Sequence, residues 1–274
     1  MTDATPTLRY ADKWIPIKDL EIDRRVQREK INPATVERLV KNWDENLAGV
    51  VYISHRTNGA MIILDGDHRV TAKRQKFGED ALIFCRIFEG LSFAEEGYIF
   101  VGVNPGNQPS VIDKYRVGVF TGEPQAVRID AIVRNRGYVV DGMGGHGHIN
   151  AVRVLREIDD ISFKLEFEND HLLNWVLLVV GKAWGNDRYG LQGAILLGLA
   201  HILAEYGSKV NIDTLIGVLK GYKRGPYGLL TEAQALANIQ NMRKHMAVAD
   251  RIVREYNDDV RALKNKLRPW TRTK

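Results

Sequence analysis

The spacing of apolar residues predicts alternating strands and helices in residues 1–104. Apolar positions 36, 39, 40 and 43 follow a helical period, and Asn32-Pro33 before them is a favourable helix start. Two apolar runs, 50–54 and 61–64, flank an Asn58-Gly59 pair, which is a strong signal for a β-hairpin. A helix is expected at 92–101, and a run rich in Asn, Pro and Gly at 104–109 then interrupts the pattern. These signals predict a small α/β domain over residues 1–104.

From residue 109 onward almost every periodic segment has the period of a helix. Two short helices are expected at 110–120 and 124–136, followed by a small β segment at 137–140, and this order is compatible with a helix-turn-helix at 110–140. Apolar stripes between 172 and 219 and a long helix at about 231–263 indicate a helical bundle. The predicted fold class is therefore α+β, with a mainly helical domain at 105–274. The long last helix would suit the arm of a homodimer or a spine across the bundle.

Composition restricts the class of protein without choosing a function. The chain has 274 residues, 45% of them hydrophobic, and a net charge of +5. Its single cysteine, Cys85, lies in an apolar run and is expected to be a buried hydrophobe. Without a second thiol or an N-terminal apolar leader, a reducing cytoplasmic location is expected, in a bacterium or a phage-infected cell. The most apolar stretch, 172–181, is too short to span a bilayer, so no membrane partner is expected.

The run Leu64-Asp65-Gly66-Asp67-His68-Arg69 carries the strongest chemical signal, because it stands where an apolar strand is expected to give way to a helix. Unpaired backbone N–H groups at a helix start favour an anion, and glycine lets a ligand approach the backbone closely. Arginine can bind phosphate oxygens, and a carboxylate can bind Mg²⁺. Lys73 and Arg74 would then lie on the exposed face of the helix. In the simpler interpretation Asp65 or Asp67 is only an N-cap.

Residues 15–88 resemble the ParB/sulfiredoxin superfamily. The matching features are a first strand near 14–20, the run Val26-Gln27-Arg28-Glu29, the helix from Pro33, the hairpin, the Asp-Gly-x-His-Arg box and a closing strand. In that superfamily the box after the hairpin binds a nucleotide triphosphate. The form found here is closest to the Asp-Gly-His-His-Arg box of free serine kinases. Similar boxes also occur in phage and DNA-modification proteins that bind DNA or hydrolyse nucleotides.

The resemblance implies a role for each residue of the box. Asp65 matches the catalytic aspartate, with Mg²⁺ as cofactor, and Glu29 is the candidate for the upstream catalytic glutamate. Glu29 could equally be a salt-bridge partner of Arg25 or Arg28. The residues expected at the phosphates of ATP or another nucleoside triphosphate are Gly66, Asp67, His68, Arg69 and Asn104. An ordinary interdomain turn at Asn104 is the simpler interpretation of that position.

Basic residues in the second half predict contacts with DNA. The candidates are Arg128, Arg134 and Arg136 in the helix-turn-helix, Lys223 and Arg224 in a basic loop with aromatic neighbours, and Lys264, Lys266 and Arg268 in the C-terminal tail. The tail has six cations and no acid from residue 261 to 274, and Trp270 could stack on a base. An ordinary helical hairpin, a surface loop and a solvated terminus are the alternatives.

A glycine-rich run at 141–148 contains a literal Gly-x-Gly-x-x-Gly. No parallel βαβ pattern surrounds it, so a loop is favoured over a dinucleotide site. His146 and His148 could bind a metal, but no carboxylate partner is evident from the sequence.

Together these features favour a nucleotide-dependent phosphotransferase that acts on DNA, such as a hydroxylated base of phage-type modified DNA. The alternative is a ParB-like DNA-binding protein that uses nucleotide binding or hydrolysis as a switch, without phosphotransfer. A nuclease comes third, because the sequence shows no carboxylate cluster with nuclease spacing beyond the box.

Overall fold

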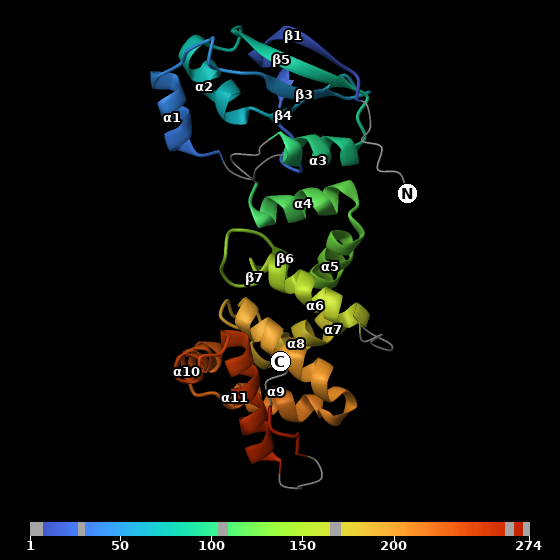
Figure 1. Ribbon diagram of the computed structural model, residues 1–274, viewed down its shortest axis with the longest axis vertical. Helices are drawn as coiled ribbons and strands as arrows, with labels where there is room; N and C mark the ends of the chain where they lie inside the picture. Colours follow the sequence, from blue (N-terminus) through green and yellow to red (C-terminus); the bar gives the residue numbers. More distant parts are fainter. Residues whose placement is uncertain (1–7, 27–30, 104–108, 165–170, 261–265, 271–274) are drawn as a thin grey trace. The chain divides into compact units, whose positions relative to one another are not determined.

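The computed structural model describes residues 8–26, 31–103, 109–164, 171–260 and 266–270, and the fold is α+β as expected (Figure 1). The chain forms two compact units, Met1–Glu123 and Pro124–Lys274. The first unit contains a mixed sheet with helices, and the second is mainly helical.

The sheet of the first unit has the strand order β1-β5-β3-β4-β2. Its strands are β1 (Tyr10–Pro16), β2 (Leu20–Glu21), β3 (Val51–His55), β4 (Met61–Asp65) and β5 (Leu82–Glu89). β1 pairs antiparallel with β5, and β3 pairs parallel with β5 and antiparallel with β4. β4 and β2 pair in parallel. The predicted hairpin is confirmed, whereas the first strand near 14–20 is divided into β1 and β2 by a 3₁₀ turn at Ile17–Asp19.

The helices of the first unit are α1 (Pro33–Lys41), α2 (Asp67–Phe77), α3 (Phe93–Gly102) and α4 (Val111–Thr121). α1 begins as predicted, because the Asn32 side chain accepts hydrogen bonds from the Ala34 and Thr35 N–H groups and Pro33 is the first helical residue. α3 and α4 each begin with a capping box, formed by Ser92 with Glu95 and by Ser110 with Asp113.

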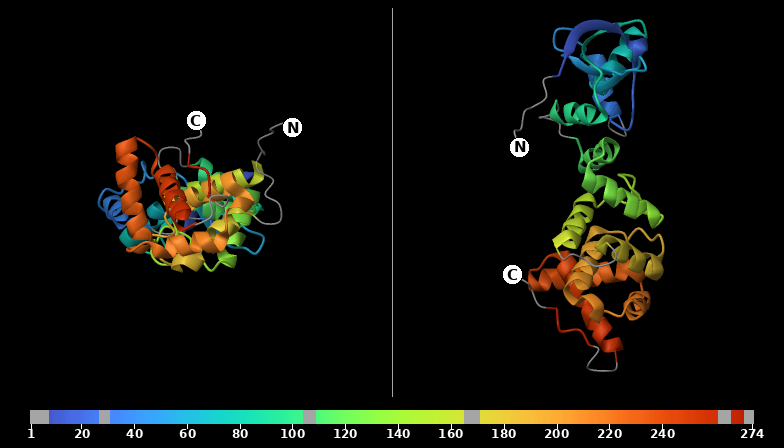
Figure 2. Two further views of the ribbon diagram at one scale, coloured as in Figure 1. Left: turned by 90° about the horizontal axis from the view of Figure 1, so that it is seen from below. Right: turned by 90° about the vertical axis from the view of Figure 1, so that its right-hand side faces the viewer.

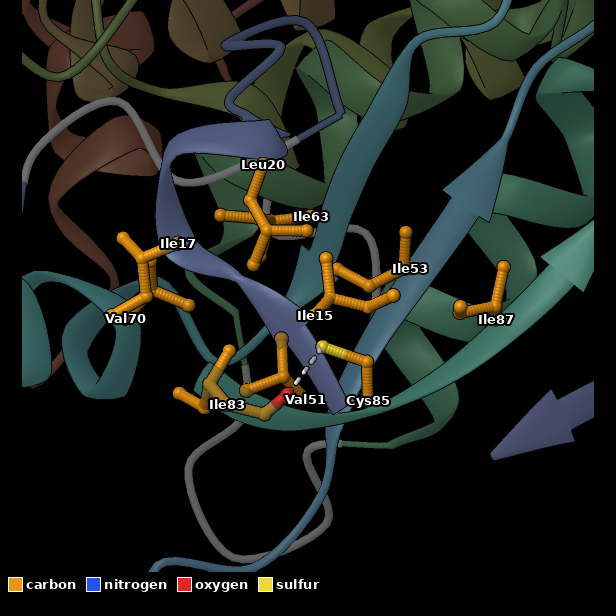
Figure 3. Close-up of a cluster of buried hydrophobic side chains, with 10 residues drawn as sticks. All are labelled: Ile15, Ile17, Leu20, Val51, Ile53, Ile63, Val70, Ile83, Cys85 and Ile87. Carbon is orange, nitrogen blue, oxygen red and sulfur yellow. Dashed lines mark hydrogen bonds between the residues drawn. The ribbon is translucent and has the colours of Figure 1, made fainter. Parts of the chain in front are cut away.

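Apolar side chains cover both faces of the sheet. One cluster includes Ile63 of β4, Val70 of α2 and Cys85 of β5 (Figure 3). A second cluster joins Ile62 and Leu64 of β4 to Ile99 of α3. Burial raises the pKa of the Cys85 thiol to about 12, so this cysteine is a core hydrophobe as expected.

The division between the units falls after Glu123 and not after the expected residue 104. The physical reason is that α4 packs on α3. The Phe93 and Phe120 rings lie 4.5 Å apart, and a Cβ on Gly97 would lie 2.7 Å from Thr121 Cγ2. α4 therefore belongs to the core of the first unit.

The second unit contains helices α5–α11 and two short strands. The elements are α5 (Pro124–Asn135), β6 (Val139–Val140), β7 (His148–Ile149), α6 (Val152–Lys164), α7 (Leu172–Trp184), α8 (Gly193–Tyr206), α9 (Ile212–Gly221), α10 (Gly225–Gln240) and α11 (Lys244–Asp259). Both helices of the expected helix-turn-helix are present as α4 and α5. α4 has its core contacts in the first unit, whereas α5 packs on α6 and α7 in the second, so the DNA-binding motif stays a prediction.

The expected long helix at 231–263 is wrong, because the chain forms two helices there. α10 ends at Gln240, the C-cap residue Asn241 adopts the left-handed conformation with φ 48°, and α11 begins at Lys244. Without a single long helix, this segment gives no support for a dimer arm. α11 packs along α8 (Figures 1 and 2). Among the described residues, no helix has both the length and the apolar character needed to cross a membrane.

Candidate functional site

The candidate nucleotide box lies at the junction between β4 and α2. β4 ends at Asp65 and α2 begins at Asp67, so Gly66 alone makes the turn. Gly66 has φ 107°, and a Cβ there would lie 2.9 Å from Val51 Cγ2, so only glycine suits both the conformation and the space. The interpretation in which Asp65 or Asp67 is the N-cap is wrong, because Gly66 is the N-cap and provides no side-chain acceptor. The positive end of the helix dipole thus lies beside a glycine.

Asp65 and Arg69 form an ion pair across this junction. The Arg69 guanidinium donates to Asp65 Oδ2 over 2.6 Å and to the Val50 carbonyl over 2.7 Å. It also donates to the Ala48 carbonyl over 3.2 Å. Arg69 therefore links the box to the segment before β3, a role that the sequence alone did not indicate. About one fifth of the Asp65 side chain and of the Arg69 side chain is exposed.

Asp67 is the first residue of α2 and is almost completely buried. Its Oδ2 accepts a hydrogen bond from Arg24 over 2.8 Å, and Arg24 comes from the segment after β2. A carboxylate at this position interacts favourably with the helix dipole. The contact brings a cation that the sequence analysis did not assign to the box.

His68 connects the box to the start of α1. Its Nε2 atom accepts a hydrogen bond from the Asn32 N–H over 3.1 Å, so this nitrogen carries no proton in the geometry observed. The structure thus brings together Asp65, Gly66, Asp67, His68 and Arg69. Two other predicted site residues, Glu29 and Asn104, lie outside the described residues.

A buried ion network that the sequence analysis missed lies along the same segment after β2. Arg56 donates two hydrogen bonds to the fully buried Glu96 of α3, over 2.8 and 2.6 Å, and one to Asp23 over 2.9 Å. Arg25 donates two more to Asp23. These bonds from Arg25 and Arg56 hold the pKa of Asp23 well below its ordinary value. The run Asp23-Arg24-Arg25, directly before Val26, was the available sequence signal.

A metal ion at this site would depend on few protein ligands. Among the described side chains, no group of three or more His, Cys, Asp or Glu residues is arranged to hold a metal. Mg²⁺ is commonly held by one or two carboxylates together with substrate phosphates, and the partly exposed Asp65 fits that requirement.

Lys73 was expected on the exposed face of α2 but is buried. It donates to Glu45 over 2.6 Å and lies 5.4 Å from the centres of the Trp14 and Trp43 rings, so it adds no free positive charge to this helix.

A family model described as "Family of unknown function (DUF6551)" matches residues 22–267. The chain belongs to this family. No curated protein and no solved structure matches the chain. The match spans residues of both compact units and includes the box. The resemblance to ParB and sulfiredoxin stays a prediction.

Two arginines of α5 and Arg136, directly after this helix, were expected to contact DNA, and all three have partners within the protein. Arg128 forms two hydrogen bonds with the fully buried Asp159, over 2.9 and 2.7 Å. Arg134 pairs with Asp130, one turn earlier, and Arg136 donates to Asn174 over 2.5 Å. Because these contacts occupy the guanidinium groups, the structure gives no support for a DNA contact by these arginines.

The tail is also less free than expected. The Leu267 N–H donates to the Asn257 side chain, whose amide donates in turn to the Leu267 carbonyl. Arg268 pairs with Glu205, and the Trp270 ring packs against Tyr206. Lys266 is exposed, and Lys264 lies outside the described residues. Residues 266–270 are therefore held against other residues of the second unit, on α8 and α11.

The glycine-rich run joins β6 and β7, which pair in parallel and have only two residues each. No helix lies between them, so this is a loop, as expected, and not a dinucleotide-binding turn. The expectation that its histidines lack a carboxylate is wrong, since His148 Nδ1 lies 2.7 Å from Asp141 Oδ2.

Lys223 and Arg224 are exposed and lie at a cavity of about 730 Å³ formed by α9, α10 and α11. Its wall also carries four carboxylates, Glu232, Glu255, Asp258 and Asp259, together with Arg251. Arg251 donates to Glu232 and Glu255. This cavity belongs to the second unit, and no residue of the nucleotide box lines it.

Proposed function

We propose that the junction between β4 and α2 binds the polyphosphate of ATP or another nucleoside triphosphate, and that the protein is a Mg²⁺-dependent phosphotransferase of the ParB/sulfiredoxin-like fold acting on DNA. The observation that carries the proposal is the helix N-terminus without a side-chain cap, directly after Gly66, with the carboxylates of Asp65 and Asp67 on either side of the glycine. Such a helix start favours an anion, and a neighbouring carboxylate suits a metal that accompanies phosphate.

Each residue of the box has a role in this proposal. Arg24 and Arg69 would neutralise phosphate charge, and the neutral His68 would contact a phosphate oxygen by a hydrogen bond. Asp65 would hold Mg²⁺ or take the proton of the attacking hydroxyl. Glu29 would act as the base or orient it, and Asn104 would contact the nucleotide. Phosphoryl transfer depends mainly on positioning and charge neutralisation, which is why so few protein groups would suffice.

DNA is proposed as the acceptor because the box is joined to a mainly helical unit that exposes basic side chains. A hydroxylated base of phage-type modified DNA offers an alcohol oxygen to the terminal phosphate. In the transfer, that oxygen forms a bond to the γ-phosphorus, the bond to the leaving diphosphate oxygen breaks, and the hydroxyl proton passes to the carboxylate.

One observation favours a second candidate function, a DNA-binding protein that uses the nucleotide as a switch. Arg69 holds Asp65 and the Val50 carbonyl at the same time. A phosphate that competes for Arg69 would release the segment before β3, which is a conformational response without phosphotransfer.

Calorimetry with ATP, GTP, CTP and UTP in the presence of Mg²⁺ tests the binding step, which both functions require. Incubation of the protein with γ-labelled nucleotide and either plain or hydroxymethylated DNA then separates them. Label on DNA supports phosphotransfer, whereas release of free phosphate, or binding alone, supports the switch. Shortened DNA would contradict both.

Asp65→Asn should abolish transfer and leave nucleotide binding within a few fold. Asp80→Asn is the matched control, because Asp80 is an exposed aspartate beyond the other end of α2, where it pairs with Lys18. Equal transfer by the two variants would show that Asp65 has no catalytic role. If no nucleotide produced heat, the proposal for the junction would be wrong as a whole.

A further inference from the structure

Two arginines and two tyrosines from separate segments of the second unit form one continuous row. The Arg188 guanidinium lies 4.6 Å from the centre of the Tyr189 ring, and Arg224 lies 4.8 Å from that of the Tyr227 ring. The two tyrosine rings lie 5.1 Å apart, edge to face. We call Arg188, Tyr189, Tyr227 and Arg224 the arginine–tyrosine row. Arg188 and Tyr189 precede α8, whereas Arg224 and Tyr227 lie at the start of α10.

Within the described part of the chain, the two arginines of this row lack an acidic partner. No described carboxylate forms an ion pair with Arg188 or Arg224, and both side chains are exposed. Arg188 donates one hydrogen bond, to the Tyr189 hydroxyl over 2.6 Å, and its other N–H groups stay available. The arginines of α5 differ in this respect, since Arg128 and Arg134 are held by aspartates. Lys223, directly before Arg224, is exposed as well. The row therefore presents positive charge and aromatic surface together.

The segment that carries Arg188 is held in place by main-chain contacts. The Asn186 carbonyl accepts from the Gly147 N–H over 2.9 Å, and the Gly185 carbonyl accepts from the Tyr138 hydroxyl over 3.1 Å. The Tyr189 N–H donates to Asp187 Oδ1 over 2.7 Å. A surface whose backbone is fixed in this way loses little conformational entropy when a ligand binds.

We propose that the arginine–tyrosine row, with Lys223, is a docking surface for single-stranded DNA. An arginine stacked on a ring keeps one planar face for a base and several N–H groups for phosphate. Stacking on aromatic and guanidinium planes requires unstacked bases, which a single strand offers and a duplex does not. The choice of DNA as the polynucleotide rests on the proposed function, whereas the surface itself does not depend on it.

The neighbouring cavity supports a strand that lies over the row and not inside the cavity. Four carboxylates line the cavity, and they would repel a phosphate backbone. Arg224 lies at the border, since it lines the cavity and its guanidinium also lies over the Tyr227 ring. Phosphates are therefore expected on the side of Arg188 and Arg224.

The test measures binding of the full chain to a fluorescein-labelled oligo-dT by anisotropy, without nucleotide, beside a duplex and an oligo-rU of the same length. Arg188→Ala and Arg224→Ala should each weaken binding of the single strand by about 10-fold, and by more than they weaken binding of the duplex. Arg153→Ala is the matched control, because Arg153 is an exposed arginine of α6 outside the row and its loss changes the net charge equally. Arg224→Lys keeps the charge, so a loss of several fold in this variant would show that stacking contributes.

Each result decides a different point. If the two row variants bind oligo-dT as tightly as the Arg153 variant, or if duplex DNA is the tighter ligand, the proposal is overturned. Tighter binding of oligo-rU with the same losses would keep the surface and overturn the choice of DNA. Asp65→Asn should bind oligo-dT normally, so failure of the nucleotide site and failure of this surface are distinguishable.

Discussion

Arg69, in the first turn of α2, lies four residues after Asp65, the last residue of β4, and its guanidinium donates a hydrogen bond to the Asp65 carboxylate over 2.6 Å. The same guanidinium donates to the Val50 carbonyl. The candidate catalytic carboxylate is thus attached, through a single side chain, to the segment that leads into β3. Any ligand that draws Arg69 away changes both contacts at once.

This relationship predicts that Arg69 contributes more to stability than Asp65. Arg69→Lys keeps the charge, but a single ammonium group cannot donate to both the Asp65 carboxylate and the Val50 carbonyl as the planar guanidinium does. The free energy of unfolding should therefore fall by about 1–3 kcal/mol. Asp65→Asn keeps an acceptor oxygen and should cost less than about 1.5 kcal/mol. Urea unfolding followed by circular dichroism measures both. A larger loss for Asp65→Asn would show that the carbonyl contacts of Arg69 contribute little.

The turn at Gly66 gives a second prediction. Gly66→Ala should lower the free energy of unfolding by about 2–4 kcal/mol, because it adds a crowded Cβ near Val51 to a strained backbone conformation. Gly122→Ala at the end of α4 is the control, since its backbone conformation (φ 81°, ψ 22°) is close to that of Gly66 (φ 107°, ψ 10°) but its Cβ would meet nothing within 4 Å. The difference between the two melting temperatures reports the crowding alone. Equal losses would mean that backbone strain accounts for the whole effect.

The buried network gives a third prediction. Arg56→Ala should destabilise the protein by about 3–5 kcal/mol, because it leaves the buried Glu96 and Asp23 without their shared cation. Arg86→Ala is the matched comparison. Arg86 also binds one carboxylate through two hydrogen bonds, but its partner Asp12 is partly exposed, so a loss near 1 kcal/mol or less is expected. Thermal unfolding distinguishes the two, and similar losses would contradict the role given to burial.

Local signals were sufficient to predict much of the first unit. Asn32-Pro33 and Asn58-Gly59 specify the start of α1 and the hairpin, because short-range capping and turn geometry depend on a few adjacent residues. The position of the box at a strand-to-helix junction followed from the same kind of signal. The boundary at residue 104 did not, since it depends on the tertiary contact between Phe93 and Phe120.

Partners of charged side chains could not be predicted from the sequence. Arg128 looked like a DNA contact on an exposed helix face, and its pairing with Asp159 depends on how α5 packs on α6. The approach of Arg188 and Tyr189 to Tyr227 is equally a product of packing between distant segments. Composition located the basic segment at 220–228. Only the fold shows that Arg224 contacts the Tyr227 ring and that this ring lies against Tyr189.

A fourth prediction follows for α5. Burial alone would raise the pKa of Asp159, but hydrogen bonds from Arg128 and Gln125 outweigh it and lower that pKa. Arg128→Ala should therefore cost about 3–5 kcal/mol, since it leaves a fully buried carboxylate without its cation. Arg134→Ala removes a surface pair one turn apart and should cost under about 0.5 kcal/mol. Thermal unfolding followed by circular dichroism compares the two variants. Unchanged stability in the Arg128 variant would contradict a structural role for its pair with Asp159, and Arg128 would again be a candidate for DNA contact.

Two stacked histidines of the second unit give a prediction on pH. The His201 and His245 rings lie 5.4 Å apart, and burial, together with the nearby charges of His201 and Arg243, lowers the pKa of His245 to about 4. Burial lowers the pKa of His201 too. Since an unfolded histidine binds a proton near pH 6.5, the unfolded chain gains protons first as the pH falls. The stability that neutral His245 contributes is therefore complete above about pH 6.5, and up to about 3 kcal/mol of it is lost as the pH falls toward 4.

Urea unfolding between pH 4 and 8 tests this dependence. The free energy of unfolding should vary less with pH for His245→Gln than for His146→Gln, a control on the exposed glycine-rich loop. Identical profiles for the two variants would show that His245 is not the group that titrates.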